Sequence, residues 1–525
     1  MASPEENMET SLVGADQARV PACVAVVGAG TMGAGIAQLA VQAGARTLLH
    51  DPIADALAAG TEKIGSMLAR LAEKGKISAE EAEAAVARLE PVDAIDGLAP
   101  AEIVIEAAPE RLELKVELLA KLAEIVGPEC VIATNTSSLS VTELAATTPG
   151  PERVVGMHFF NPAPVMRLVE VVAGMASADG ALATARALGE AMGKRVIDAA
   201  DVAGFLVNRC NRPYLLESLK LAEERIADVE TIDRIERTVG GFRMGSFELM
   251  DLVGIETNHA VAEMLHRQSY GEPRYRPSPL QARKIAAGEL GRKTGRGWYD
   301  YAGGGEYRPA DPEPPRAGGG DGRSLLIRGS LPAANLLRSM AADAGWDVSS
   351  DADGDPWLAI DFGEHTRAGG PRLRHLHDGS LHALDPEAAG FHLVPPLEGA
   401  TAIEITSTER SDPEALSRTE ELVRTLGRVP EPVGDAPGLV LGRVVCQLIN
   451  EAAFLVGEGH GTADDVDAGL ELGVNHPRGP IRWSRELGLE HVVSVLDSLR
   501  RELGEERYRV APLLRRRIAL DADLS

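Results

Sequence analysis

Residues 23–52 read CVAVVGAGTMGAGIAQLAVQAGARTLLHDP, and this stretch decides the fold. A short apolar run typical of a β-strand precedes three glycines in the pattern G-x-G-x-x-G, at Gly28, Gly30 and Gly33. A helical segment follows, and then a second apolar strand that ends at Asp51. A lone glycine pattern is a weak signal. The strand before it, the helix after it and the acid downstream make it a strong indication of a dinucleotide-binding βαβ unit.

Each part of this pattern has a physical role in holding a dinucleotide. The first glycine permits the tight turn, the second lets the backbone approach a pyrophosphate, and the third allows close packing of helix on strand. The start of the helix, at Thr31 and Met32, supplies N–H groups and a positive dipole to the phosphates. Asp51 would accept hydrogen bonds from the adenine ribose. Neither Pro52 nor Ile53 offers a cation for a 2′-phosphate, so we expect NAD rather than NADP. The alternative is a glycine turn that binds no ligand.

The later strands of this α/β stretch end in polar residues. EIVIEAAPE at 102–110, CVIATNTSSLS at 130–140 and RVVGMHFFNP at 153–162 each begin apolar and finish polar. Ligands of open α/β sheets bind at the carboxyl ends of the strands, so convergence there indicates a site rather than a core. The polar residues at these ends are Glu110, Asn135, Ser137, Ser138, His158 and Asn161.

A local basic cluster lies between the second strand and these later ones. Residues 61–90 predict two helices broken at Gly75, and the first of them carries Lys63, Arg70 and Lys74. In so acidic a chain this cluster could hold a phosphorylated ligand. A solvated helix face explains it equally well.

Composition excludes several classes of protein. The chain has 525 residues, enough for two to four domains, and a net charge of −26 argues against nucleic acid as a partner. Its four cysteines stand singly with no CxxC pair, which favours a reducing compartment, so we expect a cytoplasmic protein and assign no metal. The first 20 residues lack the features of a signal peptide, and no apolar run approaches a membrane span.

The second half of the chain repeats part of the first. A segment rich in glycine, proline and charge at 302–323 indicates a flexible linker. Beyond it, residues 437–489 align without gaps with 203–255 at a constant offset of 234, which indicates a duplicated helical domain. Residues 324–430 hold the strand-like runs SLLIRG, WLAID and ATAIEIT, but no G-x-G-x-x-G, no HFFNP and no equivalent of Ser137. They predict a degenerate Rossmann-like remnant.

The expected domain order follows from these boundaries. It is a disordered tail at 1–20, an NAD-binding Rossmann-type α/β domain at 21–201, an all-α domain at 202–301, the linker at 302–323, the degenerate Rossmann-like domain at 324–430 and a second all-α copy at 431–525.

Seven motifs in order between residues 22 and 301 resemble those of the L-3-hydroxyacyl-CoA dehydrogenases: VGAGTMGAGIA, IEAAPE, NTSSLS, HFFNPAPVMRLVEVV, GFLVNR, FELMDLVGI and LGRKTGRGWYDY. The resemblance implies a Rossmann-type NAD domain followed by a helical domain, with an acyl-CoA substrate. It implies that His158 is the catalytic base with Glu170 as its partner, and that Ser137 and Asn208 hydrogen-bond at the substrate oxygen. It also implies NAD contacts from Asp51, Glu110, Lys115, Asn135, Asn161 and Lys293. Lys74 stands where the family has a cation for coenzyme A.

The implied chemistry explains a histidine and a glutamate in one apolar segment. Oxidising a 3-hydroxyacyl thioester requires a base for the hydroxyl proton and an acceptor for the C3 hydride, and the nicotinamide is that acceptor. Histidine suits the base role because its pKa lies near neutral pH, and a carboxylate on the far ring nitrogen stabilises the imidazolium. Two antiparallel strand segments joined at the Asn-Pro-Ala-Pro turn would bring Glu170 to His158. The alternative is a purely structural ion pair.

Two features of the helical domain stand apart from the motifs. Ser246 replaces the proline of the family's Gly-Pro-Phe-Glu-Leu, and we expect it to cap the helix that starts there, with local loosening. Arg243 lies in GGFRMG, where it could clamp a distal carboxylate of the substrate or be an ordinary loop arginine.

Three functions compete for this sequence. A 3-hydroxyacyl-CoA dehydrogenase fits best. Two-copy enzymes of this layout resemble the 3-hydroxyadipyl-CoA or 3-hydroxybutyryl-CoA dehydrogenases linked to fatty acid metabolism and to the degradation of aromatic acids such as phenylacetate. Another NAD-dependent hydroxy-acid dehydrogenase, such as a sugar-acid dehydrogenase, would typically use a lysine base in the helical domain, and the pair of His158 and Glu170 argues against it. A crystallin-like NAD-binding protein would not need the intact set of Ser137, His158, Glu170 and Asn208.

The second half is expected to have no active site of its own. Its Gly442 falls where the first copy has Asn208, so the side chain is lost. Because the family dimerises through its helical domain, we expect the second copy to dock on 203–301 as an internal partner in a pseudo-dimer, with a homodimer of whole chains also open.

Overall fold

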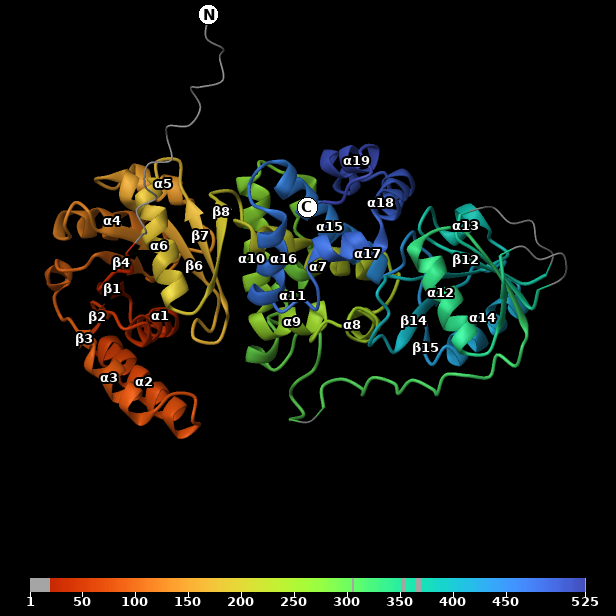
Figure 1. The fold of residues 1–525 in the computed structure, drawn as a ribbon, viewed down its shortest axis with the longest axis horizontal. Coiled ribbons are helices and arrows are strands. Elements are labelled where there is room, and N and C mark those ends of the chain that lie inside the picture. Colours follow the sequence, from red (N-terminus) through yellow and green to blue (C-terminus); the bar gives the residue numbers. More distant parts are fainter. Residues whose placement is uncertain (1–18, 305, 351–355, 364–369, 525) are drawn as a thin grey trace, which may run out of the picture. The chain divides into compact units, whose positions relative to one another are not determined.

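The computed structural model describes residues 19–304, 306–350, 356–363 and 370–524 (Figure 1). The expected tail at 1–20 therefore lies, except for its last two residues, outside the described residues. The chain divides after Asp201 into two compact units, and each is treated by itself below.

The first unit is built on one eight-stranded sheet with the order β3-β2-β1-β4-β5-β6-β7-β8. All neighbours pair in parallel except β6 and β7. The strands are β1 Cys23–Val27, β2 Arg46–His50, β3 Leu89–Pro91, β4 Ile103–Glu106, β5 Val131–Thr134, β6 Val154–Phe159, β7 Leu168–Ala173 and β8 Arg195–Ala200. Short, fully buried apolar runs such as β1 are typical of parallel strands covered on both faces.

Helices cover both faces of this sheet. The helices are α1 Thr31–Gln42, α2 Ala54–Glu73, α3 Ala79–Ala87, α4 Leu112–Ile125, α5 Val141–Ala146 and α6 Asp179–Ala191. The apolar sides of α1 and α6 share one core with inward residues of the strands, while α4 and α5 contact β5 and β6 without joining that core. The helix break expected at Gly75 is confirmed, since Gly75 has a φ of 64° between α2 and α3.

The second unit opens with the helical domain and closes with its copy. The first copy comprises α7 Val207–Glu223, α8 Val229–Thr238, α9 Ser246–Val253, α10 Ile255–Gln268 and α11 Pro279–Ala286. The second comprises α15 Leu441–Gly457, α16 Ala463–Gly473, α17 Pro480–Leu487, α18 Leu489–Leu503 and α19 Pro512–Ala519. The constant offset read from the sequence thus reproduces both ends of α7 in α15 and of α9 in α17.

Between the two copies lies a seven-stranded sheet with the order β10-β9-β11-β12-β13-β14-β15. Its strands are β9 Ser324–Arg328, β10 Asp347–Ser349, β11 Leu358–Asp361, β12 Arg372–His375, β13 Ala389–His392, β14 Ala402–Thr406 and β15 Val429–Pro432, with helices α12 Pro332–Asp343, α13 Leu381–Leu384 and α14 Pro413–Thr425. This order matches that of the first sheet without its outermost strand, β3. The single antiparallel pair, β13 with β14, takes the place of β6 with β7.

The two helical copies pack against each other through α7 and α15 (Figure 1). Arg209 of α7 donates from Nε to Glu451 of α15 at 2.7 Å, and Arg443 of α15 donates from Nε to Glu217 of α7 at 2.9 Å. These two contacts are equivalent under the repeat. Such reciprocity is the signature of an interface with two-fold symmetry.

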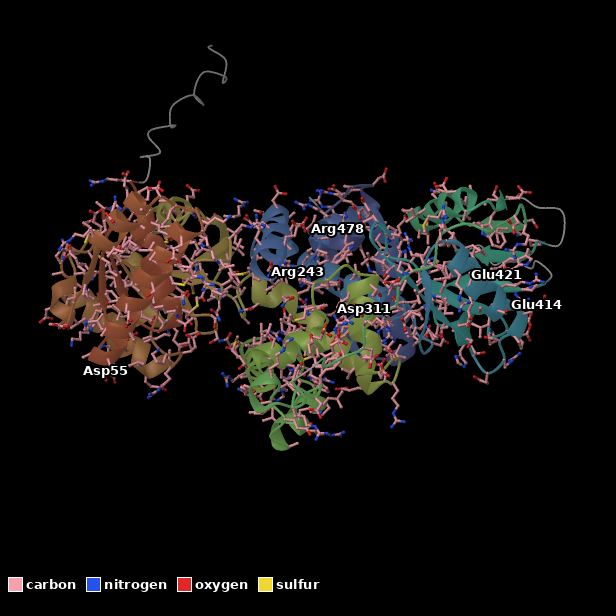
Figure 2. All side chains as sticks on the ribbon, turned by 90° about the horizontal axis from the view of Figure 1, so that it is seen from below. Asp55, Arg243, Asp311, Glu414, Glu421 and Arg478 are labelled. Carbon is pink, nitrogen blue, oxygen red and sulfur yellow. The ribbon has the colours of Figure 1, made fainter. Side chains whose placement is uncertain are left out.

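The linker at 302–323 contains no helix or strand among its described residues, but it is anchored rather than free. The Tyr307 hydroxyl and the Arg308 Nε both donate to the buried carboxylate of Glu248, at 2.7 and 2.8 Å. Arg237 also binds Asp311, which Figure 2 labels, through both Nε and a terminal nitrogen. These contacts attach this part of the linker to the first helical copy, which its composition alone does not reveal; its flexibility stays a prediction.

The expectation for Ser246 is also wrong. Gly245 is the residue before α9, and Ser246 is already its first helical residue. The Ser246 N–H donates to Glu236 at 2.6 Å, while the next two N–H groups of the helix donate to Asp233 at 2.9 Å each. Carboxylates from α8 therefore cap α9, and its first turn is firmly held rather than loosened.

Candidate active site

The glycine loop has the geometry needed to hold a dinucleotide. Gly28 has a φ of 103°, and a Cβ on Gly33 would lie 1.8 Å from the Gly28 carbonyl oxygen, so larger residues are excluded at both positions. A Cβ on Gly30, in contrast, would meet no atom within 4 Å. Gly30, the residue before α1, has no side chain with which to cap the helix, so the first N–H groups of α1 can meet phosphate oxygens. These residues fit a pyrophosphate.

Asp51 is held beside this loop. One of its carboxylate oxygens accepts the N–H of Ala29 at 2.8 Å, and the other accepts the N–H of Ile53 at 2.9 Å. The carboxylate is therefore fixed at the end of β2, adjacent to the turn that would carry the phosphates. This is where the sequence places the group for the adenine ribose.

A network of carboxylates and hydroxyls joins the ends of β4 and β5. One oxygen of Glu110 accepts from the Thr136 hydroxyl at 2.7 Å and from the N–H groups of Ser137 and Ser138 at 2.8 and 3.0 Å. Burial raises the pKa of Glu110, but Lys115 and these hydrogen bonds outweigh it and lower that pKa overall. The expected site residues Glu110, Ser137 and Ser138 are thus brought together.

Lys115 forms ion pairs inside the protein, although the resemblance implied a contact with NAD. It is buried, and its ammonium donates to Glu106 at 2.6 Å, with Glu110 at 3.4 Å. The other oxygen of Glu106 accepts from the Thr134 hydroxyl at 2.6 Å. Glu106 was not among the predicted site residues, because its partners Lys115 and Thr134 lie on other elements and the strand itself does not reveal them. A role for Lys115 toward NAD remains a prediction.

His158 and Glu170 face each other across β6 and β7, where the ladder pairs the two residues directly. The His158 Nδ1 lies 2.5 Å from a carboxylate oxygen of Glu170, and Glu170 is fully buried. A carboxylate oxygen is an acceptor, so the hydrogen bond between these two groups has Nδ1 as its donor and leaves Nε2 as the other ring nitrogen for chemistry. The antiparallel return of the chain expected from the sequence is thus confirmed.

Two further contacts position the segment that follows His158. The Asn135 side chain accepts the N–H of Phe159 at 2.9 Å, which ties the end of β5 to the end of β6. Lys194 donates to the carbonyl oxygens of Ala163 and Met166, both at 2.7 Å, and so closes the turn beyond Asn161. Asn161 itself is exposed. Lys194 was missed, because its partners are backbone carbonyls and leave no sequence pattern.

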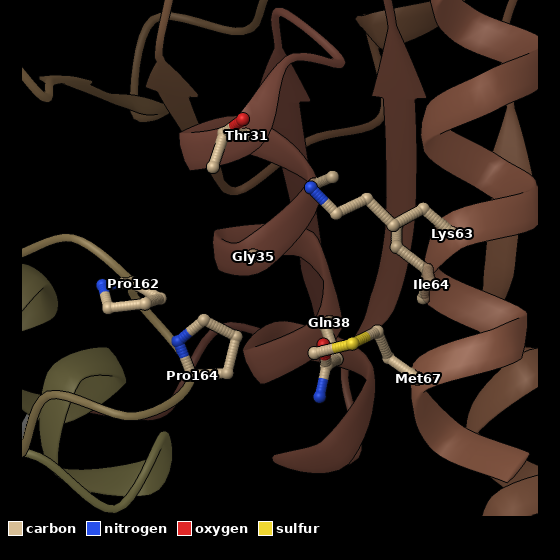
Figure 3. Close-up of a pocket in the computed structure, with 9 residues that line it drawn as sticks. Thr31, Gly35, Gln38, Lys63, Ile64, Met67, Pro162 and Pro164 are labelled. Atoms are coloured by element: carbon tan, nitrogen blue, oxygen red, sulfur yellow. The ribbon is translucent and has the colours of Figure 1, made fainter. Parts of the chain in front are cut away.

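A small cavity of about 60 Å³ lies between α1, α2 and this turn (Figure 3). Its lining includes Gly35 of α1, Met67 of α2 and Pro164 of the turn, and the Lys63 side chain extends from α2 toward α1. Lys74 lies at the exposed end of α2. Of the basic cluster, Lys63 therefore lines the cavity and Lys74 faces solvent. The role of the cluster in binding a phosphorylated ligand stays a prediction.

The remaining expected site residues belong to the second unit. Asn208 lies in the first turn of α7 and is half-buried. Lys293 forms a close ion pair with Glu256. Arg243 is exposed on the loop before α9 (Figure 2), and its neighbour Phe242 packs against Trp483 of the second helical copy with ring centroids 5.7 Å apart.

The second sheet carries a counterpart of the histidine–glutamate pair that sequence analysis missed. His392 and Glu404 stand opposite each other on β13 and β14, at the same offset of 234 from His158 and Glu170. The surrounding HFFNP motif is not retained, so the pair escaped a search by motif. Comparing the two halves at a fixed offset would have found it.

The second pair is differently connected. The Glu404 carboxylate accepts the N–H groups of Val440 and Leu441 at 2.7 and 3.0 Å, at the start of α15. The His392 Nε2 lies 3.0 Å from His491 Nε2, and its Nδ1 has no hydrogen-bond partner within the described part of the chain. A Cβ on Gly442 would lie 2.3 Å from the His392 ring, so the ring fills the space that a larger residue there would need.

Two further features concern the cysteines and the helices of the described residues. The four cysteines, all of them among the described residues, are buried and form no disulfide. None of the helices in the described ranges is both long and apolar enough to cross a membrane.

Comparison with known proteins identifies the family. Residues 23–202 match the 3-hydroxyacyl-CoA dehydrogenase NAD binding domain, and residues 204–301 and 438–522 each match the C-terminal domain of the same family. The chain is 36% identical over 499 residues to the 3-hydroxyadipyl-CoA dehydrogenase of Escherichia coli. The aligned residues make up 95% of this chain and 98% of that protein. It is 40% identical to a probable 3-hydroxybutyryl-CoA dehydrogenase of Bacillus subtilis, over 53% of this chain and 96% of that protein.

A solved structure gives the same result for the fold. The crystal structure titled 3-hydroxybutyryl-CoA dehydrogenase from Escherichia coli matches with a TM-score of 0.83 and 34% identity, over 96% of this chain and 99% of that one. The chain therefore belongs to the 3-hydroxyacyl-CoA dehydrogenase family, with the family's NAD-binding domain as its first unit and two copies of the family's C-terminal domain in its second.

Proposed function

We propose that the chain oxidises a dicarboxylic 3-hydroxyacyl-CoA, of which 3-hydroxyadipyl-CoA is the leading candidate, to the 3-oxoacyl-CoA. Family membership supports NAD-dependent oxidation of a 3-hydroxyacyl-CoA over the crystallin-like and other dehydrogenase alternatives. The similarity of nearly the whole chain to a 3-hydroxyadipyl-CoA dehydrogenase supports the finer assignment, with 3-hydroxybutyryl-CoA as the second candidate.

The His158–Glu170 contact of 2.5 Å carries the mechanistic part of the proposal. His158 would take the hydroxyl proton at Nε2 as general base, and the buried Glu170 carboxylate would stabilise the imidazolium that forms. NAD, when bound, supplies the hydride acceptor. Ser137 and Asn208 would orient the substrate oxygen. Lys74 would contact coenzyme A, and Lys293 would contact NAD.

Two substitutions test this assignment. His158→Gln is expected to lower kcat at least about 100-fold, the range for loss of a general base, with little change in NAD affinity. Glu170→Gln keeps a group that can hold the imidazole but cannot stabilise its cation, so it should also lower kcat. Near-normal kcat in His158→Gln would rule out the assignment. NAD affinity, measured by titration calorimetry, separates loss of the base from loss of the fold.

We also propose that the second half is a structural partner and not a second enzyme. Leu331 directly precedes α12, the position that Gly30 holds before α1, and Pro332 removes an N–H from the start of α12. Glu404 is engaged with α15, and Gly442 has no side chain to replace Asn208. The reciprocal contacts of α7 and α15 support its role as an internal partner in a pseudo-dimer.

This part of the proposal predicts one NAD bound per full chain in titration calorimetry. A stoichiometry of two would show that the second sheet retains a nucleotide site. Homodimerisation of whole chains is a separate question that sedimentation of the same sample answers.

A further inference from the structure

Arg212 of α7 is a buried cation for which the described residues supply no ion-pair partner. Its residue exposure is 4%, and its Nε has no hydrogen bond. Within the described ranges no carboxylate forms an ion pair with it, whereas the equally buried Arg209 and Arg443 are both paired. Burial alone lowers the pKa of Arg212 to about 10. An arginine is almost never buried unless it is paired, and no carboxylate among the residues that the structure describes provides the counter-charge for this one.

Its position on α7 relates it to Asn208. Residues four apart share one face of a helix, so Arg212 lies one turn, about 6 Å along the axis, beyond Asn208. Arg209 and Glu217 contact the second helical copy from another side of α7. Arg212 therefore neighbours Asn208, which is proposed to meet substrate, and it also borders the docking face through Arg209, three residues before it.

The internal duplication separates structural from chemical residues on this helix. Arg209 recurs as Arg443, in the copy that must also dock. Asn208 and Arg212 do not recur, because their counterparts are Gly442 and Cys446. If Arg212 were needed to build the helical fold, the second copy would need it too. Because Arg212 and Asn208 are both absent from the second copy, we associate Arg212 with the reaction.

We propose that Arg212 binds the distal carboxylate of the substrate's acyl chain and so selects dicarboxylic 3-hydroxyacyl-CoA. This inference rests on the function proposed above. A guanidinium fork binds a carboxylate through two parallel hydrogen bonds, and an adipyl-type chain places its carboxylate only a few bonds beyond C3. An uncharged acyl chain would leave the buried cation unpaired, which disfavours it.

The test compares two substrates on the same preparations. The values of kcat/KM for 3-hydroxyadipyl-CoA and 3-hydroxyhexanoyl-CoA are measured in the full chain and in Arg212→Met. The wild type should prefer the adipyl substrate, and Arg212→Met should lower kcat/KM for that substrate about 100-fold or more while changing the hexanoyl value only a few-fold. The ratio does not depend on the fraction of folded enzyme, because both substrates meet the same sample.

Three other variants sharpen the result. Arg267→Met removes one exposed arginine from α10 and should leave the ratio unchanged. Arg243→Met tests the loop arginine, and a loss of preference confined to that variant would overturn the role of Arg212. Arg212→Lys keeps the charge without the fork, serves if Arg212→Met fails to fold, and should retain only part of the preference.

The remaining outcomes separate this inference from the proposed function. A wild type that oxidises hexanoyl and adipyl substrates equally well would overturn the role of Arg212 and leave the dehydrogenase activity standing. Equal losses on both substrates in Arg212→Met would assign the residue a structural role. A wild type that oxidises neither substrate would instead refute the proposed function.

Discussion

Removing the charge of Glu451 should weaken the docking of the two helical copies. This side chain is 1% exposed and accepts hydrogen bonds from the Arg209 Nε at 2.7 Å, from Arg274 at 2.7 Å and from the Tyr275 hydroxyl at 2.6 Å. Glu451→Gln would leave two buried guanidinium groups facing a neutral amide. Arg209 would keep only the more exposed Glu458 as its anion.

The expected magnitude follows from the cost of breaking a buried ion pair by removing one partner, about 3–5 kcal/mol. Glutamine retains one acceptor oxygen, so the lower end, about 3 kcal/mol, is expected. Glu217→Gln is the matched variant. Glu217 is equally buried and accepts from Arg443 at 2.9 and 2.6 Å and from the Tyr508 hydroxyl at 3.0 Å. The two losses should be similar and, because the clusters are separate, additive in the double variant.

Hydrogen exchange is the suitable assay, because unfolding of so large a chain need not be two-state. Protection of α7 and α15 should fall in both variants, while that of β1 and β4 in the first unit should not change. A loss below about 1 kcal/mol in either variant, or a loss spread evenly over the whole chain, would refute the view that these reciprocal contacts hold the copies together.

Two further results are expected. Asp51→Ser should narrow the preference for NAD over NADP by about 1–3 kcal/mol, as measured by the two kcat/KM values, and a wild type without preference would contradict the role of Asp51. Burial lowers the pKa of His392 and His476 to about 3, and it lowers those of His375 and His491 well below the ordinary value. The unfolded chain binds these protons below about pH 6.5 and the folded chain does not, so stability should be lost as pH falls from about 6.5 toward 3, by up to about 1.4 kcal/mol per pH unit for each histidine. Thermal unfolding between pH 7 and 5 measures this, His476→Gln should reduce the slope, and a midpoint independent of pH would contradict the prediction.

The local sequence pattern was sufficient to predict much of the structure of the first unit. The glycine loop, the helix break at Gly75 and the return of Glu170 to His158 all depend on residues close in sequence, where turn chemistry and alternation decide the structure. The ends of the duplicated helices followed from a constant offset. These features can be read from the chain without knowing its long-range contacts.

Long-range partners were the part that the sequence could not provide. The caps of α9 come from α8 across a loop, and the linker is anchored by the buried carboxylate of Glu248 and by Arg237. The pair of His392 and Glu404 was hidden because its neighbours had changed although its register had not. Arg212 showed no sequence pattern, since it differs from an ordinary helix arginine only in being buried with no ion-pair partner among the described residues.

The reciprocal contacts of α7 and α15 have a consequence for how this molecule can vary. In a dimer of identical chains, one substitution alters both halves of a symmetric interface at once. A substitution that strengthens docking but impairs the reaction therefore impairs the active sites of both subunits. Here Arg209 and Arg443 are encoded at separate positions, and each side of the contact can change alone. Joining the two copies in one chain also makes their encounter independent of protein concentration. Dilution, which dissociates a pair of separate subunits, cannot part these two.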